Sequence, residues 1–389
     1  ILINPNGIMF GQGSQVNLNS FTASTRDIKG LTDLKDQLFN DVTVGGNRPN
    51  HIASAALTAK FGGAQPIIFD KSVIDSKGDG VISLDGAKFN VEGFQNGEPK
   101  TTAMSVALIG DKINIKNSEI QTYENPNTNG NFGTGYSRSG VKLITADGVQ
   151  FQYDENWGNI SEAKNGQNAV KISDNNTSVA GKDYGISIDN SQIYSGSVYV
   201  DNKYEKGNVN LNKTTLWGRK LQNGSSGEIA VKSDGNINIV NSRLETMNLG
   251  NKPTDASNPT KTANYGGITV KAKKNVTIDN SRIASAPSDL NDNLAIGEAG
   301  KSGNILIKAE NGDVTIKKSK EAVAAGNNQV GKLPIDIVSY GDLRLESDYG
   351  VVKTELTGTN TQLAAKHNLS IGAKNIELNG GAYGSQQGN

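Results

Sequence analysis

A short pattern of apolar and polar residues recurs along this chain and limits what it can fold into. Two apolar residues separated by one are followed by a polar pair, Asn-Ser, and then by another apolar residue. Four copies span residues Ile113–Ile120, Ile186–Ile193, Ile237–Leu244 and Val276–Ile283. Such alternation is typical of strands and not of helices. A weaker copy begins at Val314 and has Glu321 where its last apolar residue should stand, so we expect its third strand to be frayed or displaced.

A second apolar pair precedes the later copies at a fixed offset. It occupies Ile229 and Val231, then Ile268 and Val270, then Ile305 and Ile307, so the copies begin 39 and 37 residues apart. Repeats of this period stack into solenoids and bury their inward residues in one continuous column. We therefore predict an all-β fold, a right-handed parallel β-helix with extrahelical loops. The Asn of each pair suits the left-handed conformation of a corner and can stack its amide on the next coil, so we expect it to be structural.

Composition agrees with a slender body and excludes several classes of function. The chain has 389 residues, of which 46 are Gly and 35% are apolar, which suits many short strands joined by turns. Lys plus Arg and Asp plus Glu both total 39, so no net field attracts nucleic acid or an anionic membrane. The lack of cysteine excludes disulfides and thiolate metal sites. No apolar stretch approaches the ~20 residues of a membrane span, so we expect no membrane insertion.

The first 28 residues contain a different signal, built around Asn4-Pro5-Asn6-Gly7. Proline fixes one φ angle, and Asn or Gly adopts the positive φ of a sharp turn between strands. Ile8 follows the turn, and the block Ala23-Ser24-Thr25-Arg26-Asp27-Ile28 comes soon after. Together these residues closely resemble the secretion domain of the filamentous haemagglutinin-like exoproteins of bacterial two-partner secretion. The resemblance is specific over residues 1 to 28 and only architectural beyond them.

This resemblance implies a domain organisation and a function. Residues 1–110 would be a two-partner secretion (haemagglutination activity) domain, and residues 111–389 the β-helix shaft with loop extrusions. The family's Asn-Pro-Asn-Leu motif and capping region are missing, as is any signal peptide, so we expect the secretion domain to be incomplete at its N-terminus. A dedicated outer-membrane transporter would recognise the secretion motif, Asn4, Pro5, Asn6, Gly7 and Ile8. We expect a secreted, monomeric, non-catalytic adhesin at the bacterial surface or outside the cell.

Three polar stretches are the expected extrahelical loops: residues 121–140, 246–266 and 286–302. Each is rich in Asn, Pro, Gly, Ser and Thr and leaves its coil just after the third strand, so the loops should lie along one side of the rod. That side is the expected surface for a glycan or protein receptor. Aromatic residues in candidate loops are Tyr123, Phe132 and Tyr136, and Tyr153 and Trp157. Such rings suit glycan stacking or a protein hot spot, although they also suit packing of a loop onto the shaft.

The ends of the chain differ from its middle. Residues 29–66 lack the repeat and are consistent with a bulge or cap on the secretion domain. Residues 334–378 regain the alternation, so the β-helix should continue there.

Little in the sequence points to catalysis or to a cofactor. His51 and His367 would lie far apart in a rod, which leaves a catalytic triad or a His-metal site unsupported. The loop from Asp75 to Gly80 has Lys77 where a calcium site needs an oxygen ligand. Stacked cations such as Arg243, Arg282 and Lys320 could align with acidic residues, as a polysaccharide-degrading β-helix would require. That enzyme, and the stalk of a contact-dependent toxin, are the alternatives to an adhesin.

Overall fold

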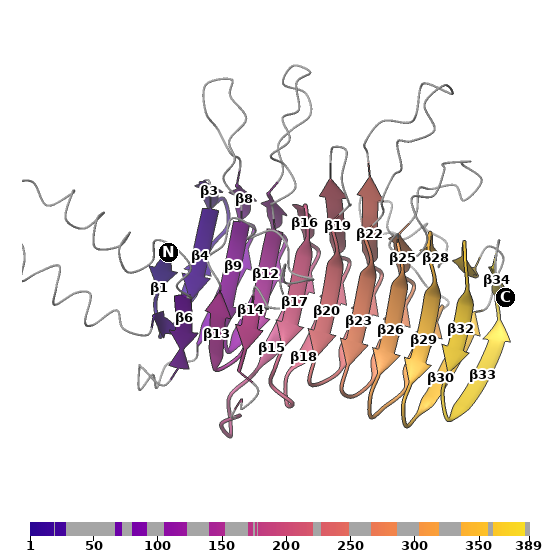
Figure 1. Cartoon of the computed structure of the whole chain (residues 1–389). Helices are drawn as coiled ribbons and strands as arrows, with labels where there is room; N and C mark the ends of the chain where they lie inside the picture. The colour runs from indigo at the N-terminus through magenta and orange to yellow at the C-terminus, as the bar shows by residue number, and fades with distance from the viewer. Residues whose placement is uncertain are drawn as a thin grey trace, which may run out of the picture.

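The chain folds into a rod of stacked coils. The computed structural model describes residues 1–18, 20–28, 67–71, 80–91, 105–122, 140–151, 170–173, 176, 178–220, 227–248, 266–285, 303–318, 336–356 and 361–385. Within these ranges every secondary-structure element is a β-strand, and most of the strands belong to three parallel sheets of ten strands each. The strands lie side by side from one end of the rod to the other, and the two termini lie at opposite ends (Figure 1). The predicted all-β parallel β-helix is confirmed.

Each coil contributes one strand to each sheet in turn, and the sheets are named A, B and C here. Sheet A contains β1 (Leu2–Ile3), β4 (Ser20–Ser24), β9 (Ser105–Gly110), β12 (Gly140–Thr145), β17 (Val198–Asn202), β20 (Ile229–Ser233), β23 (Ile268–Ala272), β26 (Ile305–Ala309), β29 (Leu343–Ser347) and β32 (Leu369–Gly372). Sheet B contains β2 (Ile8–Phe10), β7 (Val81–Asp85), β10 (Lys112–Lys116), β15 (Gly185–Asp189), β18 (Asn208–Asn212), β21 (Ile237–Val240), β24 (Val276–Asp279), β27 (Val314–Lys317), β30 (Val351–Leu356) and β33 (Asn375–Gly380). Sheet C contains β3 (Gln15–Asn17), β8 (Lys88–Asn90), β11 (Glu119–Gln121), β16 (Gln192–Ser195), β19 (Thr215–Lys220), β22 (Arg243–Asn248), β25 (Arg282–Ser285), β28 (Asp336–Ser339), β31 (Gln362–Ala365) and β34 (Ala382–Ser385). Coils are numbered 1 to 10 along these three rows.

The repeat sets the register between coils. Equivalent aliphatic residues are direct partners across neighbouring strands, as Ile113 is of Ile186 and Ile237 is of Val276. All of these side chains are buried in one hydrophobic cluster that extends from coil 1 to coil 9. The weaker copy at Val314 is displaced as expected, because its third strand is β28, which pairs with β25 and β31.

The corner between sheets B and C explains the Asn residues of the repeat. Positive φ angles occur there in eight of the described coils, at Gly13, Gly86, Asn117, Asn190, Lys213, Asn241 and Asn280, and at Gly380 and Gly381 in coil 10. The Nδ2 atom of Asn190 donates a hydrogen bond to Oδ1 of Asn117 at 2.8 Å, so amides of neighbouring coils do stack. The serine that follows each Asn accepts a hydrogen bond from the backbone amide at the equivalent corner of the coil before, as Ser281 Oγ does from the Ser242 N–H. These pairs are structural, as the sequence predicted.

A fourth sheet, sheet D, was not predicted. It is antiparallel and contains β14 (Val170–Ile172), β13 (Gly148–Phe151), β6 (Ile67–Asp70) and β5 (Asp27–Ile28), in that order. Its strands leave the β-helix between sheets A and B in coils 2 and 4. They cover the outer face of sheet A, where Ile28, Phe69 and Val149 pack on Ile109 and Ile144 in a second core. Residues 29–66, predicted as a bulge or cap, lie outside the described part of the chain.

The predicted boundary at residue 110 coincides with no break in the sheets. Strand β9 ends at Gly110 and pairs with β4 on one side and β12 on the other. Sheet D also joins strands from both sides of that boundary. The division into a secretion domain and a shaft therefore stays a prediction.

Candidate functional site

The secretion motif forms a tight turn between β1 and β2. The Gly7 amide donates to the carbonyl of Asn4 at 3.1 Å, and the Asn6 amide donates to the Asn4 side chain at the same distance. Gly7 has a φ of 117°, and a Cβ there would lie 3.0 Å from the carbonyl oxygen of Val81. Asn4 and Asn6 are exposed, whereas Ile8 is buried in the core. Asn4, Gly7 and Ile8 therefore each have a structural role in the turn, which still presents the side-chain amides of Asn4 and Asn6 to solvent.

The block that follows the motif is buried, and Arg26 is at its centre. The Arg26 guanidinium lies 2.6 Å from the Asp111 carboxylate, and neither side chain is exposed to solvent. Its Nε donates to the Ala146 carbonyl at 3.0 Å, and its Nη2 donates to the Tyr204 hydroxyl at 3.0 Å. One side chain thus joins coil 2 to coils 3, 4 and 5. This part of the N-terminal block maintains the register of the fold.

Lysines complete this buried network beneath sheet D. Lys71, which follows β6, lies 3.2 Å from Asp111 and 3.0 Å from Asp147, and Lys182 lies 3.8 Å from Asp111. Burial alone would raise the pKa of Asp111, but Arg26 and Lys71 outweigh it and hold that pKa below its usual value. Burial raises the pKa of Tyr204. The acid therefore stays ionised and paired, which suits a structural network better than proton transfer.

The aromatic residues predicted for the loops all lie outside the described residues: Tyr123, Phe132, Tyr136, Tyr153 and Trp157. The described strands fix where the chain leaves and re-enters the β-helix, because the three predicted loops each follow a strand of sheet C and precede a strand of sheet A. Two predicted bounds are too wide: Gln121 and Gly140 belong to β11 and β12, and the loop predicted at 246 begins only after β22 ends at Asn248. The stretch at 319–335 differs, because it connects sheet B to sheet C.

An aromatic pair that the sequence analysis missed lies on the outer face of sheet C. Tyr194 on β16 is the direct register partner of Trp217 on β19, and their ring centroids are 4.7 Å apart at an interplanar angle of 63°. Both side chains are half-buried, and the Tyr194 hydroxyl donates to the Gln192 side chain. A signal for them was present: each aromatic follows the inward residue of a third strand, Ile193 or Leu216, and must therefore point outward.

Next to this pair, four charged side chains form a chain of ion pairs across three coils. Glu245 Oε1 accepts from Arg243 Nη2 at 2.8 Å and from Arg282 Nε at 2.9 Å. Arg282 Nη1 in turn donates to Asp336 Oδ2 at 2.8 Å. Arg243 is the register partner of Arg282, and both bond to acidic side chains, the alignment that the sequence analysis considered for the enzymatic alternative; Lys320 lies outside the described residues. Burial raises the pKa of Asp336, and Arg282 partly offsets this.

These outward residues of β16, β19, β22, β25 and β28 are called the sheet C face. Its polar and aromatic members are Gln192, Tyr194, Thr215, Trp217, Arg243, Glu245, Arg282 and Asp336, of which Thr215, Glu245 and Asp336 are buried. Each carboxylate of the face is bonded to arginine, so no acid or base is left unpaired for catalysis. The face combines aromatic rings with neutralised polar groups, a composition suited to binding.

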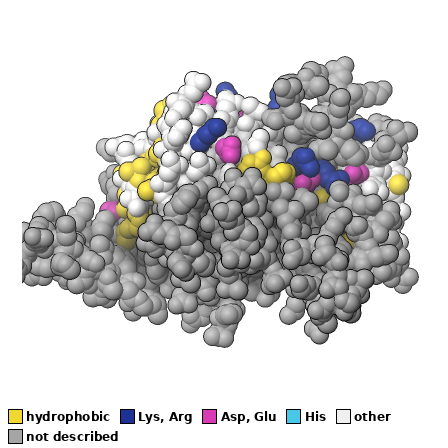
Figure 2. All heavy atoms as spheres, turned by 90° about the horizontal axis from the view of Figure 1, so that it is seen from above, with side chains coloured by type: hydrophobic (Ala, Val, Ile, Leu, Met, Phe, Trp, Pro, Cys, Tyr) yellow, Lys and Arg dark blue, Asp and Glu magenta, His cyan; other side chains and the backbone are white. Residues whose placement is uncertain are grey.

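The rest of the surface adds little chemistry. Seen from above, hydrophobic side chains gather at the N-terminal end of the rod, and basic and acidic side chains lie interspersed further along it (Figure 2). The exposed apolar residues of coil 1 include Ile1, Leu2 and Met9. Among the described residues seen in this view, no patch of one charge stands out.

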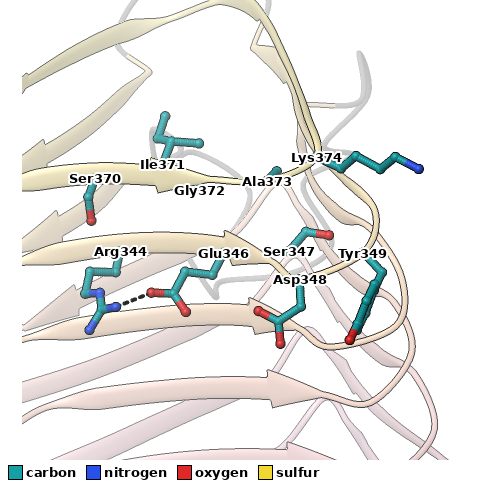
Figure 3. Close-up of a pocket in the computed structure, with 10 residues that line it drawn as sticks. All are labelled: Arg344, Glu346, Ser347, Asp348, Tyr349, Ser370, Ile371, Gly372, Ala373 and Lys374. Carbon is teal, nitrogen blue, oxygen red and sulfur yellow. Dashed lines mark ion pairs between the residues drawn. The ribbon is translucent and has the colours of Figure 1, made fainter.

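A hollow of about 770 Å³ lies at coils 9 and 10, lined by β29, β32 and the turns that follow them. Figure 3 shows Arg344, Glu346 and Asp348 in a row along it, with Tyr349 and Lys374 at its end. Arg344 pairs with Glu346, and Lys308 Nζ lies 2.7 Å from Asp348. Because both carboxylates already have cationic partners, we assign no reaction to this hollow.

The described residues contain no group of three or more His, Asp or Glu side chains arranged to hold a metal ion. His367 lies at the corner after β31, and His51 is outside the described ranges. In the part of the chain that the structure describes, no helix has the length and apolar character needed to cross a bilayer. A scan of the chain against models of protein families and a search among curated proteins each return no match.

Proposed function

We propose that this protein is a secreted bacterial surface adhesin of the filamentous haemagglutinin-like kind, without catalytic activity. The observation that carries the proposal is a rod with a continuous aliphatic core along its coils and an outward sheet C face of aromatic and neutralised polar groups. A rod of this kind projects a recognition surface away from the cell that bears it. The N-terminal resemblance to two-partner secretion exoproteins agrees with this function.

Export through an outer-membrane transporter fits the way the rod is built. Each coil of the shaft adds buried aliphatic residues to the coil before it, so a chain that emerges N-terminus first can fold by stacking, without ATP. The exposed amides of Asn4 and Asn6 are available to the periplasmic part of such a transporter. The receptor on the target cell would be a glycan or a protein.

Adhesion is tested with the purified chain coated on fluorescent beads and incubated with epithelial cells and with bacterial cells. We expect beads carrying the chain to bind at least one cell type, and a variant lacking residues 121–140 to report whether that loop contributes. Beads coated with the heat-unfolded chain are the control.

The enzymatic alternative is tested on the same preparation with pectin, xylan and other soluble polysaccharides. Release of reducing ends or of unsaturated products would contradict the proposal. Failure of the beads to bind any cell would also contradict it.

A further inference from the structure

The sheet C face has the features of an oligosaccharide site. Four outward side chains occupy one row across coils 3 to 6, because Gln121 is the register partner of Tyr194, Tyr194 of Trp217, and Trp217 of Glu245. Two aromatic rings are thus flanked by an amide on one side and a carboxylate on the other. Three inter-strand spacings separate the ends of the row, roughly 14 Å.

The chemistry of that row matches a sugar better than a peptide or a nucleotide. A pyranose ring offers C–H groups on its faces, which pack on aromatic rings, and hydroxyls at its edge, which bond to planar amides and carboxylates. Tyr194 and Trp217 supply the rings, half-buried and therefore partly accessible. Gln121 on β11 and Gln192 on β16 supply amides beside the rings.

The ion pairs beside the rings indicate which ligand charge suits this face. Arg243 directs both Nε and Nη2 to Glu245, and Arg282 bonds to Glu245 and Asp336 together. Two cations and two anions cancel, so the face attracts neither an acidic nor a basic sugar. From this geometry we propose that the sheet C face binds a neutral oligosaccharide, with Tyr194 and Trp217 as the aromatic contacts and Gln121 and Gln192 as the hydrogen-bonding amides. The inference rests on the proposed adhesin function and names the class of its receptor.

The two tryptophans of the chain allow a direct test. Trp157→Phe leaves Trp217 as the only indole, and Trp217→Phe leaves Trp157. Each chain is titrated with cellotetraose, chitotetraose and β1,4-galactotetraose, and with 3′-sialyllactose as the charged comparison. We expect at least one neutral tetrasaccharide to change the Trp217 emission. A response of Trp157 with none from Trp217 would place the site on the predicted loop and overturn the proposal, and so would binding of sialyllactose alone or of no probe.

Variants of Tyr194 separate binding from packing. In the Trp157→Phe chain, Tyr194→Ala should weaken the bound tetrasaccharide by about tenfold. Tyr194→Phe keeps the ring and should stay within about threefold of the parent. Because Tyr194→Ala also removes contact with Trp217, Tyr194→Leu is measured as well; it retains apolar packing, has no π face, and should lose affinity as alanine does. Equal affinity of the Leu, Phe and parent chains at unchanged melting temperature would overturn the proposal.

Cell adhesion is measured on the same variants, so that the two proposals fail separately. Beads that bind cells while no tetrasaccharide binds the sheet C face would overturn the oligosaccharide site and leave the adhesin standing. Tetrasaccharide binding at Trp217 without adhesion to any cell would support the site and contradict the adhesin.

Discussion

Coils 2 to 5 and coils 6 to 9 share one strand pattern but are held together differently. In coils 6 to 9 hydrogen bonds join equivalent residues of neighbouring coils, as the Ser242 amide donates to Ser281 Oγ at a separation of 39 residues. In coils 2 to 5 Arg26 bonds to Asp111, 85 residues away, and to Tyr204, 178 residues away. Sheet D adds a second core over the same coils. We call coils 2 to 5 the buttressed coils and coils 6 to 9 the plain coils.

This difference between the two regions determines how far local unfolding should spread along the rod. A stack whose units touch only their neighbours behaves as a one-dimensional array, in which each coil opens or closes nearly on its own. Contacts that skip over coils tie them into a single cooperative unit, at the cost of slower formation, because long loops must close first. The buttressed coils should therefore open together, whereas the plain coils should fray one at a time.

Replacement of Arg26 should have the largest effect. Arg26→Met leaves the Asp111 carboxylate buried with its closest cation removed, which typically costs about 3–5 kcal/mol. Hydrogen exchange should increase together in β4, β9, β12 and β17, while β23 and β26 keep their protection. Arg344→Ala in coil 9 is the control; its side chain is 58% exposed, and we expect a change below about 0.5 kcal/mol. Faster exchange confined to β4 would contradict a cooperative unit.

A matched pair of cavities tests the comparison directly. Ile115 in β10 and Ile278 in β24 occupy equivalent positions of sheet B, and both are fully buried. Alanine at either site should cost about 2–5 kcal/mol. Ile278→Ala should raise hydrogen exchange only in β21, β24 and β27. Ile115→Ala should raise it throughout the buttressed coils, and an equally local response would show that sheet D does not couple them.

Lys142 gives the buttressed coils a dependence on pH. It lies on the outer face of sheet A between its register partners Ala107 and Tyr199, and burial lowers its pKa to about 8. The unfolded chain, with a pKa near ~10.4, binds more protons between these two values, so stability should rise as the pH rises from 8 towards 10. Lys142→Met should stabilise the buttressed coils by about 1–3 kcal/mol at pH 7 and should remove this rise in melting temperature.

Lys271 in β23 is the control for Lys142, because its side chain is 40% exposed on the same sheet. Lys271→Met should change the melting temperature little at any pH. If the melting temperature rose with pH by the same amount in the Lys142→Met chain as in the parent, the pH dependence would not come from Lys142.

The sequence predicted the plain coils better than the buttressed ones, for a physical reason. Stacked Ile and Val and the corner Asn are local patterns that repeat, and they gave the sheets, the corner conformation and the displaced β28. Sheet D depends on strands as short as β5, with two residues, paired across gaps that no period connects. Arg26 was visible only as part of a block, because the partners that explain its burial lie in other coils.

The candidate site was missed for a related reason. Coil 5 contains the repeat as Val209, Leu211 and Leu216, with Lys213-Thr214 in place of Asn-Ser, and a search for Asn-Ser passes over it. Without that copy the outward position of Trp217 could not be seen, although the neighbouring coils give the same register. The aromatic residues predicted for binding were therefore those of the loops.

The smallest expected effect is at Lys213 in coil 5, where the buttressed coils meet the plain coils. Lys213 has a φ of 49° at the corner where coils 4, 6 and 7 have Asn190, Asn241 and Asn280. A lysine gains no local hydrogen bond in the left-handed region, whereas Asn tolerates it and presents an amide to the coils on either side. Lys213→Asn should therefore stabilise the chain by about 0.5–1 kcal/mol, measured by denaturant unfolding. Lys213→Ala, which has neither the amide nor an easier φ, should give no gain; an equal gain from alanine would trace the effect to the lost charge and not to the corner.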